Sequence, residues 1–449
     1  MEIAKQAGNG ALREGCGFRV GAAISLSPTG GRISGKGRTA EMAAAEIPNL
    51  TDSARAVLRL LASHGPVTRP KLGAMLDLSK PTMSAAVSEL SALGLVASRG
   101  IERGAIGRTA TIYGIGPGAG YAIGIDVGAA QVRAVAYSMD AQKLASAEEP
   151  IPETIAGDAD EIGAVVLSVA RATMAGVARS FRALRAIAVA VPRIVSNDRF
   201  DRPGGPSAVL GLLRRGIEVP IILENNVNCA AIGEMHFGAA QGHQTFAFLQ
   251  VGVRVGLGFI TEGRLFRGAG GAAGEIGRMP FPWSTSETPY REGLEHYLGS
   301  RALIERCRVD WPEHEGMPPD SAKDLFARAL EGSPPAVAAV ARHAADIGRL
   351  AAGCIGMLDP GLIVLGGGVG RNPLMTDNVA HVAAELAWPT RIAVSSLEDG
   401  GTALGAMKLA VDYSLGLMLR EGRHPAVVLP PLSEQQQDAT GTTGHAGDG

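Results

Sequence analysis

The sequence predicts an α/β fold in which a small winged helix-turn-helix domain precedes a larger domain of alternating strands and helices. Three observations predict it. Three short helical patterns and two strand patterns follow one another between residues 50 and 118. From residue 121 onward, apolar strand patterns alternate with amphipathic helical patterns. An apolar run at 219–223 leads into a polar corner and a helix, which is where an open α/β sheet places its ligand-binding residues.

Length and composition bound the class of protein. The chain has 449 residues, about three times the length of one average domain, so two or three domains are expected. A net charge of -2 excludes a uniformly basic nucleic-acid coat but permits a local basic patch. No membrane-length apolar run and no secretory leader pattern are found, so we expect the cytoplasm. Neither a disulfide framework nor a cysteine zinc site is expected from four widely spaced cysteines: Cys16, Cys229, Cys307 and Cys354.

Glycine-rich segments with weak periodicity lie at both ends and between the two domains. Residues 1–49 are expected to form a flexible leader without chemistry. Residues 116–120 read Gly-Pro-Gly-Ala-Gly and are a natural linker. Residues 417–449 form a C-terminal tail that we expect to be disordered at its end.

The winged helix-turn-helix is predicted over residues 50–118. Capping side chains predict the starts of three helices: Thr51, Thr68 and Ser79. Pro81 fits the first turn of the third helix, where a missing amide hydrogen is harmless. Two short strands, 95–98 and 110–115, flank a wing loop at 99–108. Three helices followed by a two-stranded ribbon are typical of this domain.

The charge of this segment favours DNA. It holds eight Arg and Lys against four Asp and Glu, a net of +4 in a slightly acidic chain. Basic side chains supply the phosphate contacts that dominate affinity for duplex DNA, while a recognition helix reads base edges. A protein-contact module is the alternative. We predict DNA contacts from the third helix, the wing and nearby cations: Arg69, Lys71, Ser79, Lys80, Thr82, Ser84, Arg99, Arg103 and Arg108.

A polar corner follows the apolar run of the larger domain. Residues 224–228 read Glu-Asn-Asn-Val-Asn, and a helical pattern begins after them. Such a corner is where an open α/β sheet binds its ligand. A plain turn that caps the helix at Asn225 or Asn226 is the other interpretation.

This corner resembles the Glu-Asn-Asp-x-Asn corner of the ROK family, which contains sugar kinases and repressors. Residues 268–278 resemble the family signature Gly-x-x-Gly-x-Ala-Gly-Glu-Ile-Gly-His, and residues 78–84 resemble the recognition segment of ROK-type repressors. The resemblance covers about residues 50–415. It implies a two-lobed, actin-like ATPase (ribonuclease H-like) domain at 119–416, with lobes at about 119–230 and 231–400 and a last helix that returns to the first lobe.

The resemblance also implies residues for a sugar-like effector. Glu275 matches a family glutamate that binds sugar hydroxyls, and Arg278 stands where the family has a histidine that binds sugar and zinc. The family's zinc-binding cysteines are missing from residues 279–292, so no metal site is expected. The full set of candidate effector residues is Gly205, Asn225, Asn226, Glu275, Arg278 and Glu295.

Departures from the family fall on the chemistry of phosphoryl transfer. Asn226 replaces the aspartate that acts as general base, and an amide cannot accept a proton near neutral pH. Residues 129–131 read Ala-Ala-Gln where the first phosphate loop has Gly-Thr-Lys. In the second phosphate loop Val253 and Arg254 replace Thr and Gly. Arg254 is expected either to crowd a nucleotide phosphate or to bind an anionic effector. We expect no catalytic residue and no cofactor.

The sequence therefore predicts a DNA-binding transcriptional regulator, most simply a repressor. Its kinase-dead ROK domain is expected to bind a sugar-like effector and to form a homodimer or homotetramer on operator DNA, away from membranes. The alternative is an ATP-dependent sugar kinase with an appended helix-turn-helix. A third hypothesis is a ligand-independent DNA-binding scaffold.

Overall fold

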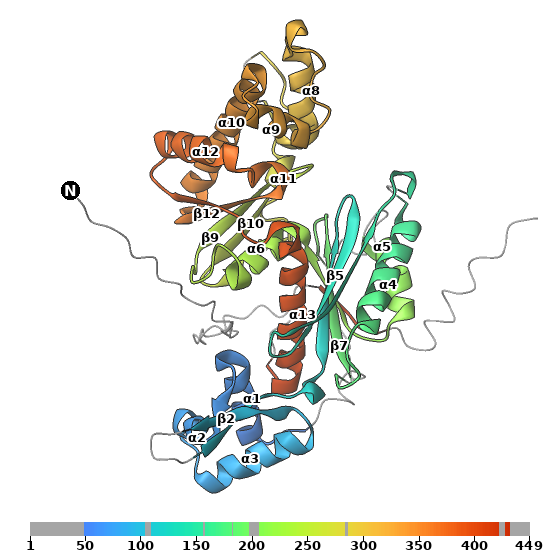
Figure 1. The fold of residues 1–449 in the computed structure, drawn as a ribbon, viewed down its shortest axis with the longest axis vertical. Coiled ribbons are helices and arrows are strands. Elements are labelled where there is room, and N and C mark those ends of the chain that lie inside the picture. The colour runs from blue at the N-terminus through green and yellow to red at the C-terminus, as the bar shows by residue number, and fades with distance from the viewer. Residues whose placement is uncertain are drawn as a thin grey trace, which may run out of the picture. The chain divides into compact units, whose positions relative to one another are not determined.

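The computed structural model describes residues 49–103, 109–155, 158–181, 183–196, 206–282, 286–421 and 427–431. Arg108 and Gly205, two of the predicted site residues, lie outside these ranges, as do the leader before residue 49 and the tail after residue 431. Two compact units are present (Figure 1): one contains residues 49–119 and 138–142, and the other contains 120–137 and the chain from 143 onward. In the described ranges, no helix has the length and hydrophobicity that a membrane crossing needs.

The first unit is built from three helices and a three-stranded sheet in the order β1-β3-β2. Its helices are α1 (Asp52–His64), α2 (Arg69–Leu76) and α3 (Lys80–Ala92), and its strands are β1 (Val67–Thr68), β2 (Val96–Arg103) and β3 (Thr109–Ile115). The buried stripes of the helices form its core: Leu58, Leu61, Leu72, Met83, Val87 and Leu90.

Two of the three predicted helix caps are confirmed. Thr51 Oγ1 accepts from Ala54 N at 3.3 Å, and Ser79 Oγ accepts from Thr82 N at 3.3 Å. Thr68 takes the capping position of α2, but its side chain makes no capping hydrogen bond. Thr68 instead belongs to the short strand β1, which pairs with β3 and makes the sheet three-stranded where two strands were expected.

The wing strand is longer than the sequence predicted. β2 continues to Arg103, which lies opposite Thr109, after an irregularity between Ser98 and Gly100. Arg99 and Arg103 therefore lie in a strand and not in the wing loop. Pairing with β3 explains the extension, because β3 offers a partner for every residue from Gly100 to Arg103.

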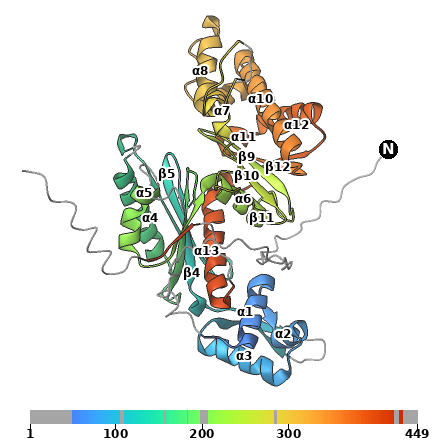
Figure 2. The same ribbon diagram turned by 180° about the vertical axis from the view of Figure 1, so that it is seen from behind.

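The second unit contains two sheets. The first is six-stranded, in the order β14-β8-β7-β4-β5-β6, with α4 and α5 on one face and α13 on the other (Figures 1 and 2). Its strands are β4 (Tyr121–Val127), β5 (Gln131–Ser138), β6 (Lys143–Pro150), β7 (Leu184–Val191), β8 (Ile221–Asn225) and β14 (Val427–Leu429). The helices are α4 (Ala159–Ala175), α5 (Pro206–Gly216) and α13 (Gly401–Leu419).

One detail differs from the sequence prediction. β14 lies in the segment assigned to the tail, and it pairs antiparallel with β8 at the edge of the sheet.

The second sheet is five-stranded, in the order β11-β10-β9-β12-β13. The strands are β9 (Phe246–Val251), β10 (Val255–Thr261), β11 (Arg264–Leu265), β12 (Leu362–Gly366) and β13 (Arg391–Val394). Helix α6 (Asn226–Phe237) packs against β9 and β10. The remaining helices are α7 (Gly293–Leu298), α8 (Ser300–Asp310), α9 (Ala322–Leu330), α10 (Pro334–Leu358), α11 (Gly367–Gly370) and α12 (Pro373–Leu386).

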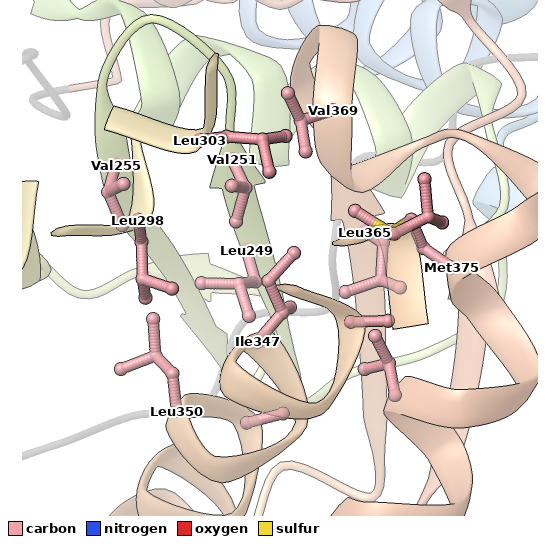
Figure 3. Packing of buried hydrophobic residues seen from close by; sticks show 14 of the residues in the cluster. Leu249, Val251, Val255, Leu298, Leu303, Ile347, Leu350, Leu365, Val369 and Met375 are labelled. Atoms are coloured by element: carbon pink, nitrogen blue, oxygen red, sulfur yellow. The ribbon is translucent and has the colours of Figure 1, made fainter. Parts of the chain in front are cut away.

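Alternation along β9 divides the core around this sheet in two. Leu249 and Val251 point into the cluster shown in Figure 3, together with Leu365 of β12 and Ile347 of α10. Phe248 belongs to the separate cluster that includes residues of α6. This is the period of two that a strand with both faces buried requires.

Helix α13 joins the two halves of the unit through close backbone contacts. A Cβ on Gly405 would lie 1.7 Å from the Cys229 carbonyl oxygen of α6, and a Cβ on Gly124 of β4 would lie 2.2 Å from Met407 N. Only glycine allows these approaches. The tight contact fixes α6, and with it the corner that precedes α6.

Candidate functional site

The corner between β8 and α6 is organised by Asn225. Its Oδ1 accepts from Val227 N at 2.8 Å and from Asn228 N at 3.3 Å, so Asn225 caps α6. Its Nδ2 donates to the Arg193 carbonyl at 3.1 Å and to Glu275 Oε1 at 3.4 Å. The capping interpretation is thus correct for Asn225, and the same side chain also reaches Glu275 of the signature segment.

Glu224, the residue before Asn225, holds this corner in place with a buried carboxylate. Only 3% of the residue is exposed, and its Oε1 accepts from Asn225 N and Asn228 Nδ2, both at 2.9 Å. Its Oε2 accepts from Arg267 Nε at 2.7 Å. A buried carboxylate is tolerated only when it is paired in this way. Arg267 was not predicted, because nothing in its neighbourhood indicates a partner 43 residues away.

The signature segment places Glu275 beside Arg278. Glu275 Oε2 lies 3.2 Å from Arg278 Nε, and Arg278 Nη2 lies 3.8 Å from Glu292 Oε1. Burial raises the pKa of Glu275, whereas the charge of Arg278 lowers it. Arg278 therefore lies between two carboxylates and is shared by both. Glu292 was not predicted, because its contact arises only when α7 folds back.

Glu295 of α7 faces the β9–β10 turn. Its Oε2 accepts from Val255 N at 3.3 Å, which holds one carboxylate oxygen against the first residue of β10. Its charge also contributes to the raised pKa of Glu275, after the larger effect of burial. The two acids therefore lie close enough to influence each other.

A cleft brings these elements together. It is formed by the β8–α6 corner, the β9–β10 hairpin, the signature segment and α7. The lining residues are Pro192, Asn225, Asn226, Val227, Gln250, Arg254, Val255, Gly256, Leu257, Ala273, Gly274, Glu275 and Glu295. Four of the six predicted effector residues line it. Arg278 reaches it through its ion pair with Glu275, and Gly205 lies outside the described residues.

Arg254 occupies the turn between β9 and β10. Its Nη1 donates to the Pro192 carbonyl at 3.3 Å, and the residue is exposed. The turn is closed by a hydrogen bond from Gly252 N to the Arg254 carbonyl at 3.0 Å. The long side chain therefore lies along the cleft where the family pattern has bare backbone.

The segment that matches the first phosphate loop closes on itself. Gly128 N donates to the Gln131 carbonyl at 3.0 Å. Asp126 at the end of β4 is 7% exposed, and burial raises its pKa to about 7, against a lowering effect of Arg133. Arg133 Nη2 lies 3.4 Å from Asp399 Oδ2, and Arg371 Nη2 lies 2.8 Å from Asp399 Oδ1. The cations near this loop thus have carboxylate partners in the protein.

The candidate DNA interface centres on α3. Lys80 is exposed at the first helical position, where its amine is able to reach a phosphate. Ser79 and Thr82 join their hydroxyls at 2.8 Å as part of the cap, and Ser84 is half-buried. Ser88, two turns along, is exposed and extends the same helix surface.

Three of the predicted cations have partners within the domain. Arg69 Nη2 donates to Tyr113 Oη at 2.7 Å, and Lys71 Nζ lies 2.9 Å from Glu102 Oε1. Arg99 donates to the Ile115 carbonyl and to Asp140 in the turn between β5 and β6. Arg103 is exposed at the end of β2. Lys80 and Arg103 are thus the described cations best placed for phosphates.

In the described ranges, no group of three or more His, Cys, Asp or Glu side chains is arranged to hold a metal ion. Three cysteines, Cys229, Cys307 and Cys354, are buried free thiols. Burial raises the pKa of Cys354 to about 12, so this thiol stays protonated and behaves as a small apolar side chain.

The fold and the cleft define a two-lobed, sugar-kinase-like domain that follows a winged helix-turn-helix along the chain. Residues 122–413 match the model of the ROK family, and residues 49–104 match the model of the MarR family. The chain belongs to the ROK family and carries an N-terminal winged helix-turn-helix of the MarR type.

Relatives of known name include repressors and kinases. The chain is 22% identical over 384 residues to a xylose repressor of Caldicellulosiruptor bescii, covering 80% of this chain and 95% of the relative. It is 27% identical over 208 residues to a glucokinase of Thermotoga maritima, covering 42% of this chain and 65% of that one. The repressor match thus extends over both units, while the kinase match covers less than half of the chain.

Solved structures agree on the fold. A ROK family transcriptional regulator, described as a homologue of the E. coli MLC protein, superposes with a TM-score of 0.65 at 20% identity, over 82% of this chain and 97% of that chain. A ROK glucokinase from Streptomyces griseus superposes with a TM-score of 0.54 at 24% identity, over 65% of this chain and 100% of that chain. Both show that the two-lobed fold predicted from the sequence is correct.

Proposed function

We propose that this protein is a DNA-binding transcriptional repressor whose ROK domain binds a sugar-like effector without chemically changing it. One observation carries the proposal: a winged helix-turn-helix, with Lys80 and Ser88 exposed on α3, precedes a ROK domain whose cleft has an amide at Asn226. The match to the xylose repressor of Caldicellulosiruptor bescii, which covers 80% of this chain and 95% of that relative, supports the proposal. A protein that acts on chromosomal operators works in the cytoplasm.

DNA is bound through α3 in the major groove and through the wing. Lys80 and Arg103 contact phosphates, and the exposed surface of α3 reads base edges. Ser79 caps the helix, and the hydroxyls of Ser79 and Thr82 present their remaining hydrogen-bonding capacity to the backbone of the DNA. Arg69, Lys71 and Arg99 act chiefly inside the domain, because each has a protein partner.

The effector is bound in the cleft by hydrogen bonds to its hydroxyl groups. Glu275 and Glu295 accept from hydroxyls, while Asn225 holds Glu275 in place and Arg278 balances its charge. The effector shifts the population of two conformations of the repressor, with a coupling of roughly 1 to 3 kcal/mol. A homodimer or homotetramer places two recognition helices on one operator, which fits the symmetry of such sites.

Three departures from the family pattern support the expected lack of phosphoryl transfer. Asn226 cannot take a proton, residues 129–131 lack the usual phosphate donors, and Val253 and Arg254 replace the Thr and Gly of the second phosphate loop. A sugar kinase with an appended helix-turn-helix is the second candidate, favoured only by the shared fold.

Two assays on the purified chain separate the candidates. A coupled assay with ATP and a panel of hexoses, pentoses and N-acetylhexosamines tests the kinase. Fluorescence anisotropy with genomic fragments tests the repressor. Sequence-selective DNA binding without turnover supports the repressor, whereas turnover of any sugar, or DNA binding without sequence preference, contradicts it.

A further inference from the structure

The cleft is chemically two-sided. Glu275 and Glu295 offer carboxylate oxygens along the signature segment and α7. Asn226 and Arg254 offer nitrogen donors along the β8–α6 corner and the β9–β10 turn. A ligand that satisfies both sides must carry donors at one end and strong acceptors at the other.

The donors on the second side have few partners among the described residues. Asn226 Oδ1 accepts from Val227 N at 3.0 Å, and its Nδ2 has no acceptor among the described residues. The Arg254 guanidinium has five N–H groups, of which one donates to the Pro192 carbonyl. Neither residue forms an ion pair within the part of the chain that the structure describes.

Arg254 differs in this respect from two other guanidinium groups near the cleft. Arg267 is paired with Glu224 at 2.7 Å, and Arg278 with Glu275 at 3.2 Å. Arg254 is bonded to a neutral carbonyl, yet its positive charge reaches the cleft, because it lowers the pKa of Glu275. A planar guanidinium without a carboxylate partner matches a phosphate or carboxylate group with two parallel hydrogen bonds.

We infer that the effector is an anionic monosaccharide, whose acidic group binds Arg254 and Asn226 while its hydroxyls bind Glu275 and Glu295. The inference rests on the proposed sensor function and narrows its ligand class. Sugar phosphates and sugar acids share the required chemistry. Arg278 offsets the charge of Glu275, and Val255 N holds one oxygen of Glu295 at the β9–β10 turn.

Isothermal titration calorimetry on the full chain tests the inference with matched probes: glucose, glucose-6-phosphate and glucuronate; N-acetylglucosamine and its 6-phosphate; and inorganic phosphate. At least one anionic sugar should bind about tenfold or more tightly than its neutral parent, and more tightly than inorganic phosphate. Whichever of glucose-6-phosphate and glucuronate binds more tightly identifies the acidic group of the effector.

Variants assign the preference to these residues. Arg254→Gln should reduce the affinity for the anionic sugar about tenfold or more. The affinity for the neutral parent sugar should change by less than about twofold. Asn226→Asp should also reduce the affinity for the anionic sugar, because the new carboxylate repels its acidic group. Arg391→Gln, an exposed arginine on β13, is the matched control and should change neither. Thermal melting verifies that each variant is folded.

The inference is overturned if every neutral sugar binds as tightly as its anionic partner, if no probe binds, or if Arg254→Gln leaves the preference intact. DNA binding without ligand is measured on the same samples. If the DNA is bound selectively but no anionic preference exists, this inference fails and the proposed function stands. If DNA is not bound, the proposed function itself fails.

Discussion

At the scale of single residues, Asn226 is one of three departures from the kinase pattern on which the proposed lack of turnover rests. It stands where the family pattern has an acid, and its Oδ1 is already engaged with Val227 N at 3.0 Å. Restoring the acid alone does not restore the rest of the machinery, because the loop at 128–131 and Arg254 are unchanged.

We therefore predict that Asn226→Asp shows no ATP-dependent turnover of any sugar that the wild type binds. A coupled assay measures this, with a ROK glucokinase as the positive control. Turnover above the background of the wild type would show that the other two departures are harmless, and that the domain is one substitution away from an enzyme.

Asp126 predicts a pH dependence of stability. Burial raises its pKa from 3.8 to about 7. Between these values the folded protein holds a proton that the unfolded chain has lost, so stability falls as the pH rises from about 4 to 7. Asp126→Asn cannot lose this proton, so its stability should not fall in this way. The free energy of unfolding of the variant, relative to the wild type, should therefore increase by up to about 4 kcal/mol from pH 4 to 7.

Urea unfolding at pH 4, 5.5 and 8 measures the effect. Other carboxyl groups titrate equally in both proteins, so the informative quantity is the difference between them. A difference that does not change with pH would mean that Asp126 is ionised throughout in the folded protein.

At the scale of elements, the contact of α13 with α6 is the most demanding feature. A Cβ on Gly405 would lie 1.7 Å from the Cys229 carbonyl, whereas a Cβ on Gly353 of α10 would meet no atom within 4 Å. Gly405→Ala should cost about 2 to 3 kcal/mol of unfolding free energy, because the two helices must separate.

Gly353→Ala is the matched control, since it makes the same change at an exposed position of α10. It should raise the free energy of unfolding by about 0.5 to 1 kcal/mol through helix propensity. Denaturant titration of both variants measures these changes. Equal changes in the free energy of unfolding would mean that α13 and α6 are less tightly packed than the contact implies.

The winged helix yields a prediction for DNA. Lys80→Ala on α3 should weaken binding to all sequences and reduce the slope of log affinity against log salt by about one, because one phosphate contact is lost. Arg99→Ala should leave that slope unchanged, since Arg99 is bonded to Asp140 and the Ile115 carbonyl. Anisotropy at several salt concentrations tests both. A reduced slope for Arg99→Ala would instead make Arg99 a DNA contact.

At the scale of the whole molecule, local patterns predicted the elements well and their partners poorly. The caps Thr51 and Ser79 mark helix starts through hydrogen bonds within four residues. By contrast, β14 and the pair of Arg267 with Glu224 depend on contacts between distant segments, for which the chain carries no local signal. Arg99 shows the same limit, because its charge suggested DNA and its partner Asp140 lies 41 residues away.

The candidate cleft was predicted better than its detailed bonding. Asn225, Asn226, Glu275 and Glu295 were chosen from motifs that are far apart in the sequence, and the structure brings all four to one cleft. Glu292 was not chosen, because it approaches Arg278 only after α7 packs against the signature segment. Whether these residues bind a sugar stays a prediction.

The most direct test of the account is a genome-wide capture of DNA fragments by the purified full chain, with Lys80→Ala as the comparison, followed by an ATP-turnover assay on the same preparation. We predict that the wild type enriches a small set of fragments sharing a sequence with twofold symmetry, that Lys80→Ala enriches them weakly, and that no sugar is phosphorylated. Fragments without a shared sequence, or phosphorylation of any sugar, would contradict the account.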